Sequence, residues 1–394
     1  MEFAFTEKEE AFRQEVRDFL ATELPPGLEI DEVSFGTRYD EVQAFIRKMG
    51  EKGWLTLAWP KEYGGRGASP MEQIIFMEEM AYHRAGGMCI GTTWVGPSIM
   101  NYGTEEQKKK YLPEISSGEI EVCLGYSEPQ AGSDLASLQT RAVADGDQYV
   151  INGQKIFTSM AHVAKYCWLA ARTNPEAPKK HKGISMFMVD MNTPGITVRP
   201  LYDLRGSRVF NEVFFDDVRV NKDCLVGGEN NGWYVLMTAL SLERGTWGGG
   251  ANNVATCQRL LDELVNYVKA TEVNGKPLAD DPSVQDKLAQ MAIDIEVARL
   301  LAYRLAWIQS RGIIPVSESS VSKIFGSEMQ RNMGNIAMDI AGLHGQLKAN
   351  SKWTPLNGHI ENMYLWAIAP SIGAGTDEIQ RGLIATMGLG LPRQ

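Results

Sequence analysis

The chain has 394 residues, of which 44% are hydrophobic and 22% are charged, a composition typical of a globular protein with more than one core. Its formal net charge of −10 argues against a nucleic-acid-binding protein, although a local basic patch for a phosphorylated ligand remains open. The five cysteines form no C-x-x-C pair and the five histidines show no ligand spacing, so we expect neither a disulfide framework nor a metal site. Without an export signal or a long apolar run, the sequence predicts a cytoplasmic protein with no membrane span.

Residues 1–120 show helical patterns throughout and predict an N-terminal helical domain. Thr6 and Glu9 have the spacing of a capping box, and the helix that follows is expected to end near Pro25. Further helical patterns, separated by loops rich in Gly and Pro, cover 39–52, 71–83 and 105–111.

Residues 121–225 change to short alternating runs and predict a middle β domain, either a barrel or a sandwich. Two β runs within 148–159 flank Asn152-Gly153, a dipeptide that favours a tight hairpin turn. Later strands are expected at 166–172, 184–190 and 212–220.

Residues 226–394 return to the helical period and predict a C-terminal helical bundle. The expected helices cover 232–270, 282–311, 317–343, 356–368 and 376–387. The predicted fold class is therefore mostly α with a central β domain.

Glu243 lies on the apolar face of the first of these helices. The face is formed by residues at helical spacing: Trp233, Leu236, Leu240, Trp247, Val254, Leu261 and Val268. Burial raises the pKa of a carboxyl group, which suits a general base near neutral pH. Pairing with an arginine of a neighbouring helix is the alternative.

Three consecutive glycines, Gly248 to Gly250, follow Glu243 in the same predicted helix. Each costs roughly 1 kcal/mol relative to alanine in a helix interior. Either close helix packing or space for a ligand beside Glu243 would offset this cost.

Four motifs together resemble the acyl-CoA dehydrogenase family over the whole chain. They are Gly125-Tyr-Ser-Glu-Pro-Gln-Ala-Gly-Ser-Asp134, Asn152-Gly-Gln-Lys155, Phe215-Asp-Asp-Val-Arg219 and Gly375-Thr-Asp-Glu-Ile-Gln-Arg381. Two other stretches, 53–65 and 172–176, are similar to the bacterial branch that acts on bulky or cyclic CoA thioesters, steroid side-chain enzymes among them.

The resemblance implies α,β-dehydrogenation of an acyl-CoA thioester on bound FAD, as in fatty acid, aromatic or steroid catabolism by β-oxidation. A carboxylate removes the Cα proton, hydride leaves Cβ for flavin N5, and an electron-transfer flavoprotein takes the electrons. By family position, the cofactor-binding residues are expected to be Leu124, Tyr126, Ser127, Ser133, Phe157, Thr158, Ser159, Thr376 and Glu378. The substrate-binding residues are expected to be Ser133, Arg244, Trp247, Gly248, Gly249, Ala374 and Gly375.

The sequence departs from the commonest family pattern at the catalytic base. Most members carry a glutamate where this chain has Ala374, and alanine cannot accept a proton. A minority place the base at the acidic position of a Leu-Glu-Arg stretch, which here is Glu243. Both the apolar face and the resemblance therefore predict Glu243 as the catalytic residue. The family uses the backbone N–H at the Ala374 position to polarise the thioester carbonyl, and this donor does not depend on the side chain.

A second departure concerns assembly. Homotetrameric members bind a neighbour's FAD through Arg-x-x-Phe-Gly and Gln-x-x-Gly-Gly, where this chain has Thr271-Glu-Val-Asn-Gly275 and Asp339-Ile-Ala-Gly-Leu343. These losses favour an α2β2 heterotetramer with a sister subunit. A homotetramer whose motifs have diverged is the alternative.

Other functions remain open beside the dehydrogenase. One is a non-catalytic or partner-dependent subunit of a mixed tetramer. Another is an enoyl-CoA reductase that runs the reverse reaction, or an oxidase of the nitroalkane type that uses O₂. Serines at the flavin positions and the inward-facing Glu243 argue against a non-catalytic subunit.

Overall fold

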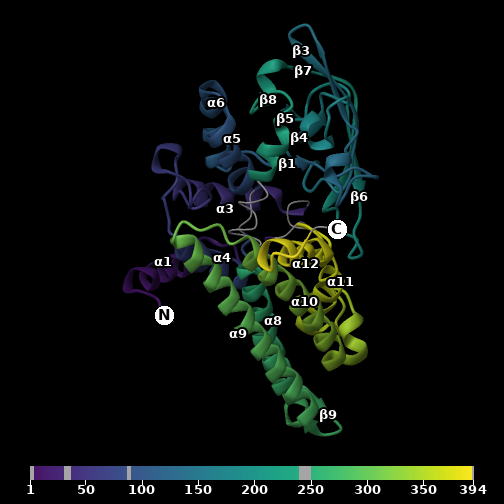
Figure 1. Ribbon diagram of the computed structural model, residues 1–394. Helices are drawn as coiled ribbons and strands as arrows, with labels where there is room; N and C mark the ends of the chain where they lie inside the picture. Colours follow the sequence, from purple (N-terminus) through teal and green to yellow (C-terminus); the bar gives the residue numbers. More distant parts are fainter. Residues whose placement is uncertain (1–3, 31–36, 87–89, 239–249, 393–394) are drawn as a thin grey trace. The chain divides into compact units, whose positions relative to one another are not determined.

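The computed structural model describes residues 4–30, 37–86, 90–238 and 250–392 (Figure 1). The chain forms two compact units. The helical unit comprises Met1–Leu24, Ser69–Gly86 and Arg244–Gln394, and the sheet unit comprises Pro25–Ala68 and Gly87–Glu243. Helices at both ends of the sequence and a sheet in the middle confirm the predicted fold class. The three-domain division, with its boundaries at 120 and 225, stays a prediction.

Two N-terminal helices of the helical unit begin at capping boxes. α1 (Glu7–Glu23) follows the predicted box of Thr6 and Glu9, and α4 (Pro70–Tyr82) follows a second box. Buried ion pairs join the two helices, because Arg13 on α1 reaches Glu79 on α4 at 2.8 Å. Their apolar faces and these ion pairs together hold α1 against α4.

The rest of the helical unit is a set of helices around one apolar core. The helices are α8 (Ala251–Ala270), α9 (Pro282–Ser310), α10 (Val316–Ala341), α11 (His359–Trp366) and α12 (Asp377–Leu383). Two short strands, β9 (Glu272–Val273) and β10 (Lys276–Pro277), form a small hairpin after α8. The core contains Leu260 and Leu264 of α8, Met291 of α9 and Met333 of α10. These helices confirm the predicted bundle.

The predicted continuous helix over 232–270 is wrong at Gly250. Residues 232–238 are helical, but Gly250 has a φ of 79° and is the residue from which α8 begins. This left-handed conformation is available to glycine at no steric cost. Gly250 therefore occupies a break in the helical geometry and not a helix interior. Of the predicted buried face, Leu236, Val254, Leu261 and Val268 are buried and Trp233 is half-buried, while Leu240 and Trp247 lie outside the described residues.

The sheet unit combines a mixed eight-stranded sheet with helices. The helical segments are α3 (Tyr39–Glu51), the π-helical turn η2 (Gly91–Val95), α5 (Gly96–Tyr102) and α6 (Glu105–Ser116). The strands are β1 (Val122–Gly125), β2 (Arg141–Asp145), β3 (Gln148–Lys155), β4 (Tyr166–Arg172), β5 (Ile184–Asp190), β6 (Ile196–Leu201), β7 (Phe210–Asn221) and β8 (Leu225–Val226). Their order is β6-β7-β3-β2-β4-β5-β8, with β1 paired to β4.

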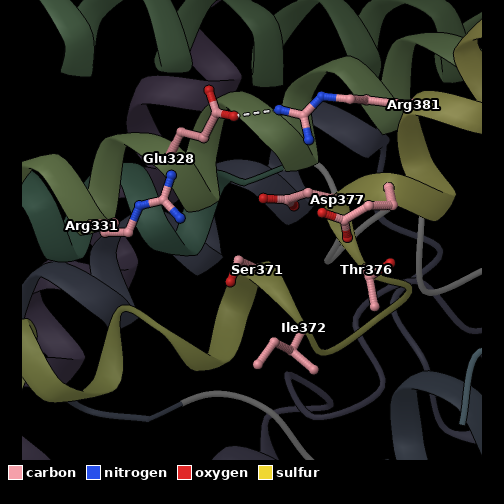
Figure 2. A pocket seen from close by; sticks show the side chains of 8 residues that line it. Glu328, Arg331, Ser371, Ile372, Thr376, Asp377 and Arg381 are labelled. Atoms are coloured by element: carbon pink, nitrogen blue, oxygen red, sulfur yellow. Dashed lines mark hydrogen bonds and ion pairs between the residues drawn. The ribbon is translucent and has the colours of Figure 1, made fainter.

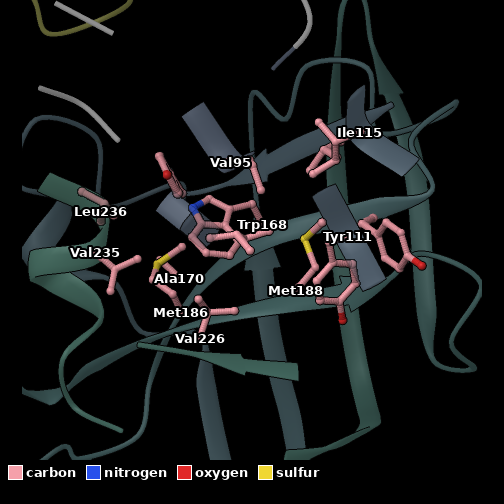
Figure 3. Packing of buried hydrophobic residues seen from close by; sticks show 14 of the residues in the cluster. Val95, Tyr111, Ile115, Trp168, Ala170, Met186, Met188, Val226, Val235 and Leu236 are labelled. Atoms are coloured by element: carbon pink, nitrogen blue, oxygen red, sulfur yellow. The ribbon is translucent and has the colours of Figure 1, made fainter. Parts of the chain in front are cut away.

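One face of this sheet packs on helices through a large apolar cluster. Figure 3 shows Trp168 of β4 at its centre, with Val95, Ala170 and Met186 around the indole ring. Trp168 is fully buried, and a buried aromatic of this size contributes several kcal/mol of stability, roughly 3–5 by truncation to alanine. The cluster fixes β1 and β4, and β1 leads directly into the first predicted flavin motif.

The predicted hairpin at Asn152-Gly153 is wrong. β3 runs straight through this pair and shows only a register irregularity against β7 between Ile151 and Gly153. A Cβ at Gly153 would lie 2.5 Å from Thr140 Oγ1, so this glycine allows a close approach of β2 and β3. The actual turn is at Asp145–Gln148, around Gly146 with its φ of 62°.

Candidate active site

The catalytic candidate Glu243 lies outside the described residues, as do Arg244, Trp247, Gly248 and Gly249. Their assignment rests on the sequence alone. The remaining predicted site residues fall into two groups, one in each compact unit. Each group is built by local structure that can be followed residue by residue.

The first group, in the sheet unit, is formed by the segment after β1 and the segment after β3. The Ile156 N–H donates to the carbonyl of Ser127 at 2.9 Å, and the Lys155 ammonium donates to the carbonyl of Tyr126 at 3.1 Å. These two bonds bring Tyr126 and Ser127 beside Phe157. Leu124 of β1 is partly buried and packs against the apolar cluster around Trp168.

Phe157 is an exposed aromatic side chain held in a strained backbone. Its side chain is 58% exposed and its φ is 55°, a conformation that costs a non-glycine residue about 1–2 kcal/mol. The ring contacts Phe210 of β7 edge to face, with 5.9 Å between centroids. An exposed and strained aromatic is a feature of ligand-binding surfaces, because folding alone gains nothing from it.

Thr158 and Ser159 follow Phe157 and differ in their surroundings. Thr158 exchanges backbone hydrogen bonds with Asn211 in both directions, at 3.0 and 3.1 Å. Its hydroxyl is buried and has no hydrogen-bond partner among the described residues. Ser159 is half-buried. Asn211 is fully buried and also binds the Thr158 carbonyl through its side chain, so it is a site residue that the sequence did not identify.

Ser133 lies apart from these hydrogen bonds. It is exposed in the loop after a tight turn in which Glu128 and Ala131 exchange backbone hydrogen bonds. Its neighbour Asp134 accepts from Lys180 at 2.6 Å. The structure thus brings Tyr126, Ser127 and Phe157 together. Ser133, although close to Ser127 in sequence, lies on the surface.

The second group, in the helical unit, is the turn that leads into α12. Ala374 and Gly375 both have positive φ, 56° and 84°. The Gln380 side chain donates to the carbonyl of Ala374 at 2.9 Å and so holds the strained turn in place. Thr376 is the N-cap of α12 and its hydroxyl accepts from the N–H of Ile379. Thr376 therefore has a structural role beside the one predicted for it.

A polar pocket of about 310 Å³ opens beside this turn (Figure 2). It contains the predicted cofactor residues Thr376 and Glu378, together with Arg331 of α10. Arg381 is paired with Glu328 at 2.6 Å, whereas Arg331 makes no ion pair within the described part of the chain. Arg331 is thus a cation without an ion-pair partner in this pocket, and the sequence did not reveal it, since its place there depends on how α10 packs.

A metal site and a membrane-spanning helix are both absent from the described residues. No group of His, Cys, Asp or Glu there is arranged to hold a metal ion. Within the same ranges, no helix has the length and apolar character needed to cross a membrane.

The comparisons with known proteins match the chain from end to end. The sequence models of the N-terminal, middle and C-terminal domains of acyl-CoA dehydrogenase match residues 6–119, 123–218 and 230–389. The acyl-CoA dehydrogenase FadE26 of Mycobacterium tuberculosis is 38% identical over 100% of this chain and 99% of its own length.

Two solved structures are similar over the whole chain. A structure named the Tcur3481-Tcur3483 steroid ACAD superimposes with a TM-score of 0.91 at 36% identity, covering 100% of both chains. The ChsE4-ChsE5 complex of Mycobacterium tuberculosis gives a TM-score of 0.90 at 37% identity, again with 100% of both chains covered. Members of this family are FAD-dependent flavoproteins. The chain belongs to the acyl-CoA dehydrogenase family and is an oxidoreductase that acts on CH–CH groups.

Proposed function

We propose that this chain catalyses the FAD-dependent α,β-dehydrogenation of an acyl-CoA thioester with a bulky, cyclic or aryl acyl group. The observation that carries this proposal is the strained, exposed ring of Phe157 beside Ser127. The hydroxyls of Ser127 and Ser159 have no hydrogen-bond partners among the described residues. An aromatic surface with free polar groups beside it fits a flat ring with polar edges. Bound FAD would supply the hydride acceptor.

Glu243 is the proposed base for the Cα proton. A Cα–H beside a thioester is a weak acid, so its removal needs both a positioned carboxylate and a donor to the carbonyl oxygen. The backbone N–H of Ala374 is the proposed donor. Its support is the left-handed turn that Gln380 holds by its bond to the Ala374 carbonyl, because a fixed donor needs no rearrangement as negative charge develops.

The bulky substrate is supported by the sequence after Glu243 and by the relatives. Gly248 and Gly249 leave space where other residues would place side chains, and Trp247 offers a ring for stacking. One of the similar solved structures is named a steroid ACAD. The break at Gly250 reduces the number of glycines that need this explanation from three to two.

We further propose that the chain works in an α2β2 heterotetramer and passes electrons to an electron-transfer flavoprotein. Asp339, at the place of the family glutamine, is ion-paired with Lys287, so its carboxylate already has a partner. α9 presents exposed apolar side chains along one face: Ile293, Val297, Leu300 and Trp307. Such a face is typical of a subunit interface. Both similar solved structures carry the names of two different proteins.

Glu243→Gln tests the catalytic part of this proposal. The variant should keep the visible absorbance of bound flavin and bind acyl-CoA, yet reduce the flavin at least ~100-fold more slowly, the scale of a removed general base. Glu272→Gln, at an exposed carboxylate of β9, is the matched control and should react as the wild type does. Near-normal flavin reduction by Glu243→Gln in stopped flow would exclude Glu243 as the base.

A further inference from the structure

Lys155, the last residue of β3, carries a charge that is completely buried in the sheet unit. Its ammonium donates to Glu128 Oε1 at 2.8 Å and to the carbonyl oxygen of Tyr126 at 3.1 Å. The side chains of Lys155 and Glu128 are 0% and 2% exposed. Neither residue of this pair is among the predicted site residues, although both lie within the motifs that carry the family resemblance.

Glu128 is saturated by donors from its own surroundings. It accepts from the backbone N–H groups of Gln139 and Thr140, at 2.6 and 2.9 Å, as well as from Lys155. Burial alone would raise the pKa of Glu128, but Lys155 and these donors hold the pKa below its ordinary value. Burial lowers the pKa of Lys155 from its ordinary value and the Glu128 carboxylate opposes this shift, so the ionised carboxylate is what keeps the Lys155 cation in place.

Stability alone does not account for such a pair. A buried ion pair loses its hydration, and apolar residues of similar volume often stabilise a protein equally well or better. The specific effect of Lys155 is on the direction of a peptide group, because its second partner, the Tyr126 carbonyl, belongs to the backbone and not to a side chain. That carbonyl belongs to the segment that also carries Tyr126 and Ser127, two predicted cofactor-binding residues.

The planar geometry of the peptide bond links the position of Lys155 to the direction of the Ser127 N–H. A trans peptide is planar, so the N–H of Ser127 points opposite to the carbonyl of Tyr126. With that carbonyl turned toward Lys155, the Ser127 N–H points away from Lys155. It has no backbone acceptor among the described residues. The Ser127 carbonyl is likewise turned inward by the N–H of Ile156.

We infer that Lys155 and Glu128 form a buried positioning pair that aims and polarises the Ser127 N–H toward the polar edge of the flavin. A cation on the Tyr126 carbonyl withdraws electron density through the peptide and makes the Ser127 N–H a stronger donor. Such a donor stabilises added electron density on the ligand that accepts from it. This inference rests on the proposed flavin site and names residues that set its affinity and its reduction potential.

The test is the double variant Lys155→Met with Glu128→Gln, made in the complex in which the wild-type chain retains FAD. Removing both charges together leaves no unpaired buried charge, so the fold should be retained. Two quantities are measured besides activity: the dissociation constant of FAD, and the reduction potential by equilibration with a reference dye. The matched control is Lys165→Met with Glu114→Gln, which removes a partly exposed ion pair of the same unit.

The double variant should bind FAD roughly tenfold more weakly, the scale of one hydrogen bond, and its reduction potential should become more negative. The control should match the wild type in both. Lys155→Gln combined with Glu128→Gln keeps a neutral donor on a shorter side chain without leaving a buried charge unpaired. It should fall between the two, which gives a second variant if the first folds poorly. An unchanged potential and affinity in both Lys155 variants would overturn this inference and leave the proposed function intact. A wild-type complex without FAD would instead overturn the proposed function.

Discussion

The Lys323 ammonium lies 2.8 Å from a carboxylate oxygen of Asp377 and ties the first turn of α12 to the middle of α10. Asp377 is buried and also accepts from the hydroxyl of Ser327 at 3.1 Å. Its two sequence neighbours, Thr376 and Glu378, are the predicted cofactor residues of this turn. Asp377 thus anchors the motif, while Thr376 and Glu378 remain at its surface.

Gln380 is the second anchor of the same turn, and its loss should reduce catalysis. Its side chain donates to the Ala374 carbonyl and accepts from Ser320 at 2.7 Å. Gln380→Leu removes both bonds and loosens the left-handed turn at Ala374, the residue whose N–H is the proposed donor to the thioester. Since small displacements of a catalytic group are costly, we expect kcat to fall by about tenfold or more with a smaller change in KM.

Steady-state kinetics on one acyl-CoA substrate checks this expectation. Gln290→Leu, at an exposed position of α9 where the side chain bonds only Asp294, is the control and should leave kcat unchanged. A change in KM alone in Gln380→Leu would show that the turn serves binding and not the polarisation of the carbonyl.

Much of this fold could be predicted because its signals are local. The capping box of Thr6 and Glu9 and the strands 166–172 and 184–190 are found as expected. The hairpin error occurred where a distant segment decides the conformation. Gly153 is explained by the approach of Thr140, which precedes β2, and the Asn-Gly pair alone cannot distinguish a turn from such a close approach.

The candidate site shows the same limit. The family resemblance named Phe157 and Ser127, but Lys155 and Asn211 hold the residues next to them, Tyr126 and Thr158, through contacts formed only in the folded chain. The place of Arg331 in the pocket likewise follows from the packing of α10 and not from a sequence motif. Buried polar residues of this kind look like ordinary strand or helix positions in a sequence.

Acid should destabilise the helical unit partly through Glu263. This carboxylate accepts from both terminal nitrogens of Arg84 at 2.7 Å and from Arg259 at 2.7 Å. Burial would raise the pKa of Glu263, but Arg84, His359 and Arg259 hold it well below its ordinary value. A carboxyl whose pKa is depressed by folding stabilises the protein above its unfolded pKa, and this contribution is lost as pH falls through the folded value.

Glu263→Gln should therefore lower the melting temperature at pH 7. The side chains of Arg84 and Glu263 are 20% and 18% exposed, so the free energy of unfolding should fall by about 1–3 kcal/mol, between the values for exposed and buried pairs. The difference from the wild type should shrink as pH is lowered below about 4, the ordinary range of a glutamate. Melting curves at several pH values measure both effects. An equal difference at all pH values would show that the loss is due to packing and not to the charge.

Assembly should depend on a partner subunit. Expressed alone, the chain should hold substoichiometric FAD or assemble poorly, since neither Thr271 nor Asp339 replaces the family's contacts to a neighbour's cofactor. Co-expression with the sister subunit should restore flavin content, measured as the ratio of flavin to protein after gel filtration. A fully flavinated, active homotetramer of this chain would contradict the prediction.

The exposed apolar face of α9 allows a direct test of where the partner binds. Leu300→Glu introduces a charge at a position that is 42% exposed, so the fold should tolerate it while assembly should not. Val143→Glu, at an exposed apolar residue of β2 in the sheet unit, is the control. Gel filtration should show a smaller species for the first variant only.

The acyl group should be bulky, and the glycines after Glu243 allow this to be tested. Gly250 is explained by its left-handed backbone at the start of α8, whereas Gly248 and Gly249 have no such explanation from the described residues. If these two glycines make space for a ring, Gly249→Leu should depress turnover of a ring-bearing CoA ester far more than turnover of butyryl-CoA. Gly382→Leu, where an added Cβ would meet nothing within 4 Å, is the control and should affect both substrates equally.

Equal losses in Gly249→Leu would mean that the glycine serves helix packing. A wild-type preference for short unbranched chains would contradict the bulky substrate itself, since a filled pocket and not an open one discriminates in favour of small acyl groups.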